Sequence, residues 1–423
     1  MIPARMAALA HGRVHYAWVV VGLMFLVMLA TAGVRSAPSV LIVPLEHAFG
    51  WSRATISGAI SLNIALYGVI GPFAAAMMQS PGLRPTVLAA LVILSISVAA
   101  SGFIAAPWQL FLTWGLLVGI GTGVTAGGLA ATIANRWFEQ RRGLAVGVLM
   151  ASNATGQLVF LPVLAAIAER GSWQTVSFVV AGAAAALIPL VFMLLPESPR
   201  KVGLLPFGAE VEPAVAVRAN PLGIAFATLR RGIRSTDFWL LFGSFWVCGF
   251  STNGLVGTHL ISFCVDHGVT EVAAAGLLAT MGVFDLIGTT LSGWLTDRFN
   301  SRYLLFWYYS LRGLSLMALP FTQFDPVSLG VFALFYGLDW IATVPPTVAL
   351  ASEVFGRRDA PVIFAWILCG HQLGAATAAA GAGIVRTETG GYLLAFVASG
   401  IACLIASLLV LRINRAPALA PAE

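Results

Sequence analysis

The sequence has few charged residues. Only 9% of its 423 residues are Asp, Glu, Lys or Arg, whereas 59% are hydrophobic and the mean hydropathy is +0.91. Soluble proteins carry about 25% charged residues, and no soluble core buries so much apolar surface. The composition therefore excludes a soluble domain and predicts an all-α polytopic membrane protein. The net charge of +6 reflects arginines retained on one side of a membrane and indicates no nucleic-acid partner.

Cysteine is also scarce, and signals for cleavage or catalysis are missing. The four cysteines lie in or beside apolar segments, at spacings that suit neither a metal site nor a disulfide framework. The short basic N-terminus leads into a full-length apolar span rather than a cleavable signal peptide. No paired-histidine motif and no serine–histidine or paired-aspartate arrangement lies at mid-span. We therefore expect neither a cofactor nor an enzyme.

Long apolar runs dominate the chain instead. Since about 20 helical residues cross a bilayer, the hydropathy pattern predicts twelve transmembrane helices, at 16–40, 54–78, 84–105, 107–132, 143–168, 173–196, 237–265, 271–296, 302–321, 326–351, 360–385 and 391–412. The proline- and arginine-rich stretch 197–236 divides the chain into six-helix halves, 1–196 and 237–423. Within this cytoplasmic linker, residues 222–234 are amphipathic and predict a short helix on the membrane surface.

The distribution of cations predicts the direction of the chain. With the N-terminus in the cytoplasm, 18 of the 23 arginines and lysines lie on the cytoplasmic side. Arg35 and Arg312 lie within spans, and the outer side has only Arg53, Arg170 and Arg386. Because positive residues are retained inside, we expect a multi-pass inner-membrane protein with both termini in the cytoplasm.

Five ionisable side chains fall inside the predicted spans. They are Arg35, Asp285, Arg312, Asp339 and His371. Such groups are functional candidates, because a partner or a task must offset the cost of burying them in a bilayer. For Arg35 that cost is about 2.5–3.5 kcal/mol. Arg35 is therefore either an anion ligand in a central cavity or a structural residue that reaches the outer headgroups or an ion-pair partner.

One scheme accounts for all five groups. Asp285 pairs with Arg312 as a structural bridge between spans 8 and 9. Arg35 binds a substrate carboxylate, because a guanidinium matches a carboxylate through two parallel hydrogen bonds. Asp339 and His371 couple transport to protons, with Asp285 as a further candidate. The alternative for Asp339 and His371 is an ordinary hydrogen bond to a polar neighbour.

Neutral polar side chains within the spans complete the candidate substrate site. They are Asn63, Tyr67, Asn153, Gln157, Asn253 and Gln372. Each of these also fits an ordinary helix–helix contact.

Two further patterns concern helix packing. Small residues at four-residue spacing in spans 4, 5 and 11 predict closely packed helices. The pair Pro345–Pro346 in span 10 predicts a break in that helix.

The two halves carry matching turns. An aromatic residue followed by two arginines comes after span 4, at Arg141 and Arg142, and again after span 10. The turn after span 8 reads GWLTDRFNSR and contains Asp297, Arg298 and Arg302. A parallel repeat of six spans is the architecture of the major facilitator superfamily, and the second turn resembles that superfamily's loop motif. The resemblance implies that these five residues act in a cytoplasmic gate.

Spans 1 and 5 resemble the monocarboxylate transporter and oxalate/formate antiporter families. The matching stretches are AWVV at 17–20, RS at 35–36, FGWSR at 49–53, and the stretch from WF at 137–138 to Gly156. The resemblance implies a monomeric, proton-coupled secondary transporter of a small organic anion that works by alternating access, with a monocarboxylate as the expected substrate. Arg35 stands near the lysine that binds substrate and proton in these carriers, but an arginine does not deprotonate.

The chain also departs from this pattern. Thr289 stands where the family has an arginine, four residues after Asp285. Two competing interpretations therefore remain. One is an efflux carrier for neutral or cationic compounds, in which Arg35 is structural. The other is a membrane sensor that transports nothing.

Overall fold

The computed structural model describes residues 15–78, 82–125, 127–210 and 221–413, and this part of the chain is helical with no strand. Ten of its segments are long and apolar enough to cross a membrane. Two further helices, α8 (Arg142–Arg170, 29 residues) and α14 (Ser301–Ala318, 18 residues), lie at the predicted spans 143–168 and 302–321. Together these segments match the twelve predicted spans.

The first group of helices contains the N-terminal part of the chain. Helix α2 packs against α8 and α9, and α4 packs against α9. Besides α8, the group consists of α2 (Tyr16–Phe49), α3 (Arg53–Met77), α4 (Leu83–Ser101), α5 (Pro107–Leu110), the π-helix η1 (Phe111–Leu117), α6 (Val118–Val124), α7 (Gly127–Trp137) and α9 (Trp173–Leu194).

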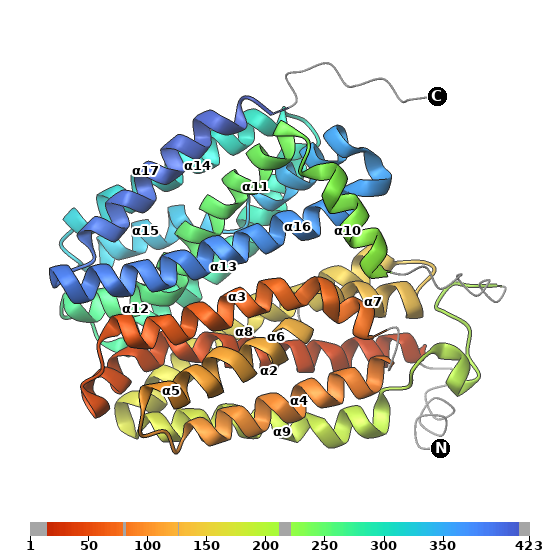
Figure 1. The fold of residues 1–423 in the computed structure, drawn as a ribbon, viewed down its shortest axis with the longest axis horizontal. Coiled ribbons are helices and arrows are strands. Elements are labelled where there is room, and N and C mark those ends of the chain that lie inside the picture. The colour runs from red at the N-terminus through yellow and green to blue at the C-terminus, as the bar shows by residue number, and fades with distance from the viewer. Residues whose placement is uncertain (1–14, 79–81, 126, 211–220, 414–423) are drawn as a thin grey trace.

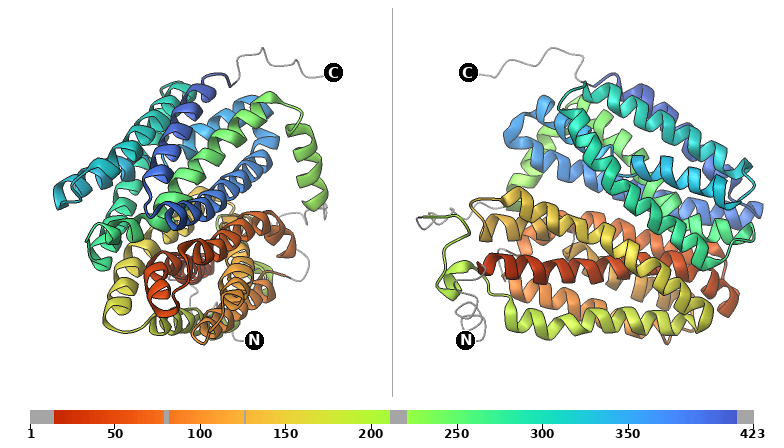
Figure 2. Two further views of the ribbon diagram at one scale, coloured as in Figure 1. Left: turned by 60° about the vertical axis from the view of Figure 1, so that its left-hand side comes forward. Right: turned by 180° about the vertical axis from the view of Figure 1, so that it is seen from behind.

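The second group lies beside the first, as Figures 1 and 2 show. Helix α3 packs against α16, and α8 packs against α13, so these pairs form the interface between the groups. Besides α14, the second group consists of α11 (Thr236–Gly249), the π-helix η3 (Phe250–Val256), α12 (Gly257–Asp266), α13 (Glu271–Thr296), η4 (Leu319–Phe321), α15 (Pro326–Asp339), α16 (Val344–Thr389) and α17 (Leu393–Val410).

The segment between the groups contains two short helices, η2 (Pro199–Val202) and α10 (Pro221–Gly232). The latter confirms the helix predicted at 222–234. Helix α10, the start of α2 and the end of α17 all lie at one end of the bundle (Figure 1), which we call the linker end. The other end, where α3 starts and α12 stops, is the far end.

The first span was predicted too short. Helix α2 continues past residue 40 to Phe49, with Pro38 and Pro44 inside it, and stops at Gly50, whose φ of 65° is left-handed. The predicted break in span 10 is present and lies at residues 340–343, just before the prolines, since α15 ends at Asp339 and Pro345–Pro346 lie in the first turn of α16. Proline suits that position, where the helix needs no N–H donor.

The small residues of spans 4 and 11 pack as predicted. A Cβ added at Gly119 would meet the backbone of Asn63, and one added at Gly374 would meet the backbone of Trp246. These glycines therefore let neighbouring helices approach closely. In span 5, by contrast, nothing lies within 4 Å of the Cβ position of Gly143 or Gly147.

Candidate functional site: a cavity between the two helix groups

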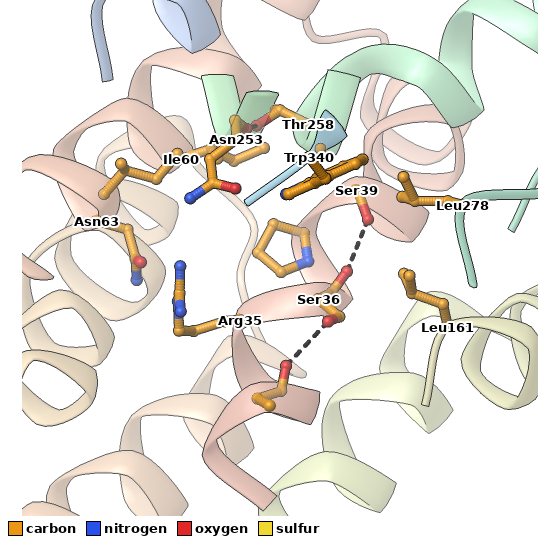
Figure 3. A pocket seen from close by; sticks show the side chains of 14 residues that line it. Arg35, Ser36, Ser39, Ile60, Asn63, Leu161, Asn253, Thr258, Leu278 and Trp340 are labelled. Carbon is orange, nitrogen blue, oxygen red and sulfur yellow. Dashed lines mark hydrogen bonds between the residues drawn. The ribbon is translucent and has the colours of Figure 1, made fainter. Parts of the chain in front are cut away.

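A small cavity lies between the two groups of helices. Its volume is about 70 Å³, and residues from both groups line it. A single buried water needs roughly 10–15 Å³, so the space suits a small solute of a few heavy atoms. Figure 3 shows Arg35 and Asn63 from the first group, and Asn253, Thr258 and Trp340 from the second, around the same space.

Arg35 is the cation of this cavity. Helix α2 carries it at mid-length, where it is half-buried, and its guanidinium Cζ lies 4.0 Å from the centroid of the Tyr67 ring. The ring face attracts the cation but leaves the N–H donors at the guanidinium edge available. Among the residues that the structure describes, no carboxylate lies within ion-pair distance of Arg35.

Two of the predicted amides line the cavity, one from each helix group. Asn63 donates from Nδ2 to the carbonyl oxygen of Trp114 at 2.6 Å, so one side of its amide holds α3 against η1. Asn253 lies within η3, and its own carbonyl accepts a hydrogen bond from Thr258 Oγ1 at 2.9 Å. Its side chain lines the cavity. Because η3 is a π-helix, the backbone hydrogen-bond pattern of span 7 changes at this point.

The other four neutral candidates differ in their surroundings. Tyr67 supports Arg35 directly. Gln372 is buried, lies against α3 at Gly68, and leaves its Oε1 without a hydrogen-bond partner in the described structure. Asn153 and Gln157 belong to α8, but their side chains lie outside the described residues.

Arg312 does not pair with Asp285, so that prediction was wrong. Its Nε lies 2.6 Å from Asp339 Oδ2, and its Nη2 donates to the backbone carbonyls of Asp339 and Trp340. Its Nη1 contacts Cys248 Sγ at 3.0 Å. The helix break after Asp339 frees these carbonyls, which explains why the guanidinium points toward span 10.

Asp285 supports the same break from the other side. Its Oδ1 accepts hydrogen bonds from the backbone N–H of Ile341 at 2.9 Å and from Thr289 Oγ1 at 3.0 Å. A carboxylate thus replaces a missing backbone acceptor where the chain leaves helical geometry. Thr289, at the position of the family's arginine, becomes a hydrogen-bond donor to Asp285.

The three predicted proton-coupling residues lie in the second group, outside the cavity lining. Asp339 and His371 are both buried, and each has a polar atom, Oδ1 and Nδ1 respectively, with no hydrogen-bond partner in the described structure. The Cys248 thiol links the Arg312–Asp339 pair to His371, because it contacts Arg312 and interacts with the His371 ring.

The far end of the bundle is closed by an ion-pair network around Arg53. This arginine of α3 binds Asp266 of α12 through two bonds, Nη1–Oδ2 at 2.8 Å and Nη2–Oδ1 at 2.7 Å. Its Nε binds Glu46 at 2.8 Å, and Arg386 of α16 binds the same Asp266 at 2.8 Å. Two backbone contacts join the groups nearby, from Ala54 N–H to Thr387 Oγ1 and from Val272 N–H to Glu169 Oε1.

Tyr392 extends this network into the second group. Its hydroxyl accepts from Arg53 Nη1 at 3.2 Å and lies 3.1 Å from His259 Nδ1, while His259 Nε2 lies 2.8 Å from the carbonyl of Ala379. The carbonyl oxygen of Ala379 can only accept a hydrogen bond, so the His259 imidazole carries its proton on Nε2, and the Tyr392 hydroxyl donates to Nδ1.

The five predicted gate residues lie at the linker end, and their contacts stay within their own helix group. Arg142 binds Glu139 at 2.8 Å and the Phe138 carbonyl at 2.6 Å, while Arg141 precedes α8 with a left-handed φ of 59°. Arg298 stacks on Trp294, Arg302 donates to the Ile413 carbonyl, and Asp297 ends α13. Asp297 forms no ion pair with a residue that the structure describes.

Sequence reasoning missed the Arg53–Asp266 pair and the cavity residue Thr258. In the sequence, Arg53 is only one of three cations on the predicted outer side. The scarcity of cations on that side was a usable signal, because two of the three share one carboxylate. Nothing in the sequence separates Thr258 from other span threonines.

Comparisons with known proteins identify the family of this chain. The family model described as "Major Facilitator Superfamily" matches residues 23–374. The "Uncharacterized MFS-type transporter YcxA" of Bacillus subtilis is 26% identical over 89% of this chain and 90% of its own length. Monocarboxylate transporter 13 of Rattus norvegicus is 25% identical over 91% and 86%, respectively.

Solved structures agree in fold. A bacterial homologue of the human lysosomal transporter Spinster, in an inward-facing and occupied conformation, superposes with a TM-score of 0.78 at 16% identity, over 97% of this chain and all of that chain. A D-xylose–proton symporter gives 0.71 at 15% identity, over 96% of this chain and all of its own. The helix arrangement, the central cavity and the family match lead to one conclusion: this chain belongs to the Major Facilitator Superfamily.

Proposed function

We propose that this protein is a secondary active transporter of a small organic anion, a monocarboxylate in the first instance, coupled to protons. The main observation in support is Arg35, a half-buried cation in the cavity between the helix groups with no carboxylate partner among the described residues. A buried charge without a partner is unfavourable, so an anionic substrate relieves it. The relatives named as monocarboxylate transporters favour the same substrate class.

The substrate carboxylate binds the guanidinium edge of Arg35, while Tyr67 holds the guanidinium plane in place. Asn63, Asn253 and Thr258 offer hydrogen bonds to the rest of the solute. The side chains of Asn153 and Gln157 in α8 remain candidates for the same role. The small volume of the cavity favours a short acid over a large amphiphile.

Proton coupling belongs to the cluster in the second group. Asp339 and His371 each offer a buried atom that takes up or releases a proton without breaking a hydrogen bond seen in the structure. Protonation of Asp339 weakens its ion pair with Arg312 and so changes how spans 9 and 10 hold together. Asp285 is a weaker candidate, because two donors already occupy its Oδ1.

Transport proceeds by alternating access between the halves 1–196 and 237–423, with 197–236 as the linker. The far-end network around Arg53 and Asp266 supports an inward-facing arrangement. Asp297, Arg298, Arg302, Arg141 and Arg142 form the opposing gate at the linker end when the far end opens. We place the protein in the inner membrane as a monomer, and the distribution of arginines favours both termini in the cytoplasm.

The test is uptake of labelled pyruvate or lactate into liposomes under an inward proton gradient. We expect accumulation that a protonophore abolishes, and its loss in Arg35→Ala without a change in thermal stability. Arg84→Ala is the matched control, because Arg84 is also a half-buried arginine over a ring, that of Phe192 at 4.5 Å, but lies outside the cavity. Undiminished uptake by Arg35→Ala contradicts the assignment, and uptake of only neutral or cationic compounds favours an efflux carrier.

A further inference from the structure

Helix α10 contacts both helix groups. Trp366 of α16 donates from Nε1 to the carbonyl of Ala225 at 3.1 Å, and its ring packs on Phe226 at 5.9 Å. Arg231 binds Asp359 at 2.7 Å. On the other helix group, Phe73 of α3 lies 6.2 Å from Phe226, so α10 touches both groups at the linker end.

An exposed apolar row runs along α10 next to a basic edge. Leu222, Phe226 and Ile233 follow one another at helical spacing, with Phe226 51% and Ile233 42% exposed. Trp239, also exposed, donates from its indole to the carbonyl of Ile233 at 2.8 Å and adds an aromatic ring at the same level. This pattern is typical of a helix that lies in a membrane interface.

The basic edge consists of Arg230 and Arg234, both exposed. Neither forms an ion pair with a residue in the described part of the chain, whereas their neighbour Arg231 binds Asp359. The two arginines are four residues apart, next to the exposed apolar side chains of Phe226 and Ile233. An amphipathic helix in a membrane interface places cations at the level of the headgroups. Their charge complements a phosphate group.

We propose that α10 is a binding site for anionic phospholipid, with Arg230 and Arg234 on the headgroup phosphate and Leu222, Phe226 and Ile233 among the acyl chains. Because Phe226 contacts both helix groups, the lipid holds α10 against the linker end and favours the arrangement seen here. The assignment concerns the linker helix and does not depend on which substrate the cavity binds.

Lipid binding by the purified full-length protein tests this directly. Phosphatidylglycerol is titrated into protein held in phosphatidylcholine, and bound lipid is counted by native mass spectrometry. Each arginine near a charged surface contributes about fivefold to affinity, so Arg230→Gln with Arg234→Gln weakens phosphatidylglycerol binding by about thirtyfold. High salt weakens the wild-type binding in the same direction.

The control removes the same net charge elsewhere. Lys201→Gln with Arg412→Gln alters two exposed cations outside α10 and leaves binding unchanged. Arg230→Lys with Arg234→Lys keeps the charge and retains most of the binding. Equal losses in the control and the α10 variant, or no preference of the wild type for phosphatidylglycerol over phosphatidylcholine, overturn the proposal.

Discussion

Arg35 and Arg312 are both arginines at membrane depth, yet their surroundings are opposite. Arg312 is 1% exposed, and Asp339, Cys248 and the carbonyl of Trp340 bind its donors. Arg35 is half-buried in a cavity, stacked on Tyr67, without a carboxylate partner among the described residues. A satisfied cation stabilises the fold, and an unsatisfied one is available to a ligand.

The largest expected effect is on folding. Arg312→Ala leaves Asp339 as an unpaired buried carboxylate, and breaking a buried pair in this way costs about 3–5 kcal/mol. We expect a large loss of folded protein and a lower Tm in detergent. Arg312→Met with Asp339→Leu removes both charges and restores much of the stability. A stable Arg312→Ala protein would show that the pair has no structural role.

The same double variant separates structure from coupling. If Asp339 carries the proton, the folded double variant loses the response of uptake to a proton gradient. If the response persists, His371 becomes the stronger candidate, and His371→Gln is the next variant to measure.

Arg35 is expected to respond in function rather than in stability. Arg35→Lys keeps the charge but loses one of two parallel hydrogen bonds to a carboxylate, and such a bond to a charged group contributes about 1.5–3 kcal/mol. Substrate affinity therefore falls about 10- to 100-fold, while Tm stays at the wild-type value. A drop in Tm as large as that of Arg312→Ala would end the distinction between the two arginines.

Arg53 differs from both Arg35 and Arg312, because its ion pair joins the two helix groups. Arg53→Gln removes the bond to Asp266 and favours opening of the far end, with an expected shift of about fivefold for roughly 1 kcal/mol. The readout is labelling of Ser57→Cys by a membrane-impermeant thiol reagent, since Ser57 is buried against Gly383. Arg386→Gln is the control, because Arg386 binds Asp266 within one group. Equal labelling in both variants argues against a gate.

The smallest effect concerns the ring beneath Arg35. Tyr67→Leu removes a cation–π contact of about 0.5–1 kcal/mol, so substrate affinity falls only a few-fold. Tyr67→Phe keeps the ring face and should bind like the wild type. A loss in Tyr67→Phe as large as in Tyr67→Leu would mean that the hydroxyl contacts the substrate.

Much of the architecture was predictable because it follows from hydropathy. The twelve spans, the break at the linker and the short helix predicted at 222–234 each depend on local composition, which a bilayer constrains strongly. Helix ends were less predictable. Residues 41–43 and 45 of the α2 extension are buried against neighbouring protein, and composition does not reveal neighbours.

The sequence by itself determined that this protein is a helical membrane protein with an arginine deep in its first span, since the scarcity of charge makes each buried ion conspicuous. Only the tertiary structure decided which ions meet. Arg312 joins Asp339 rather than Asp285 because a helix break at residues 340–343 exposes carbonyls to it. Arg53 meets Asp266 because two helix groups distant in sequence touch at one end. Such pairings depend on helix rotation and on where a helix breaks, which no single span encodes.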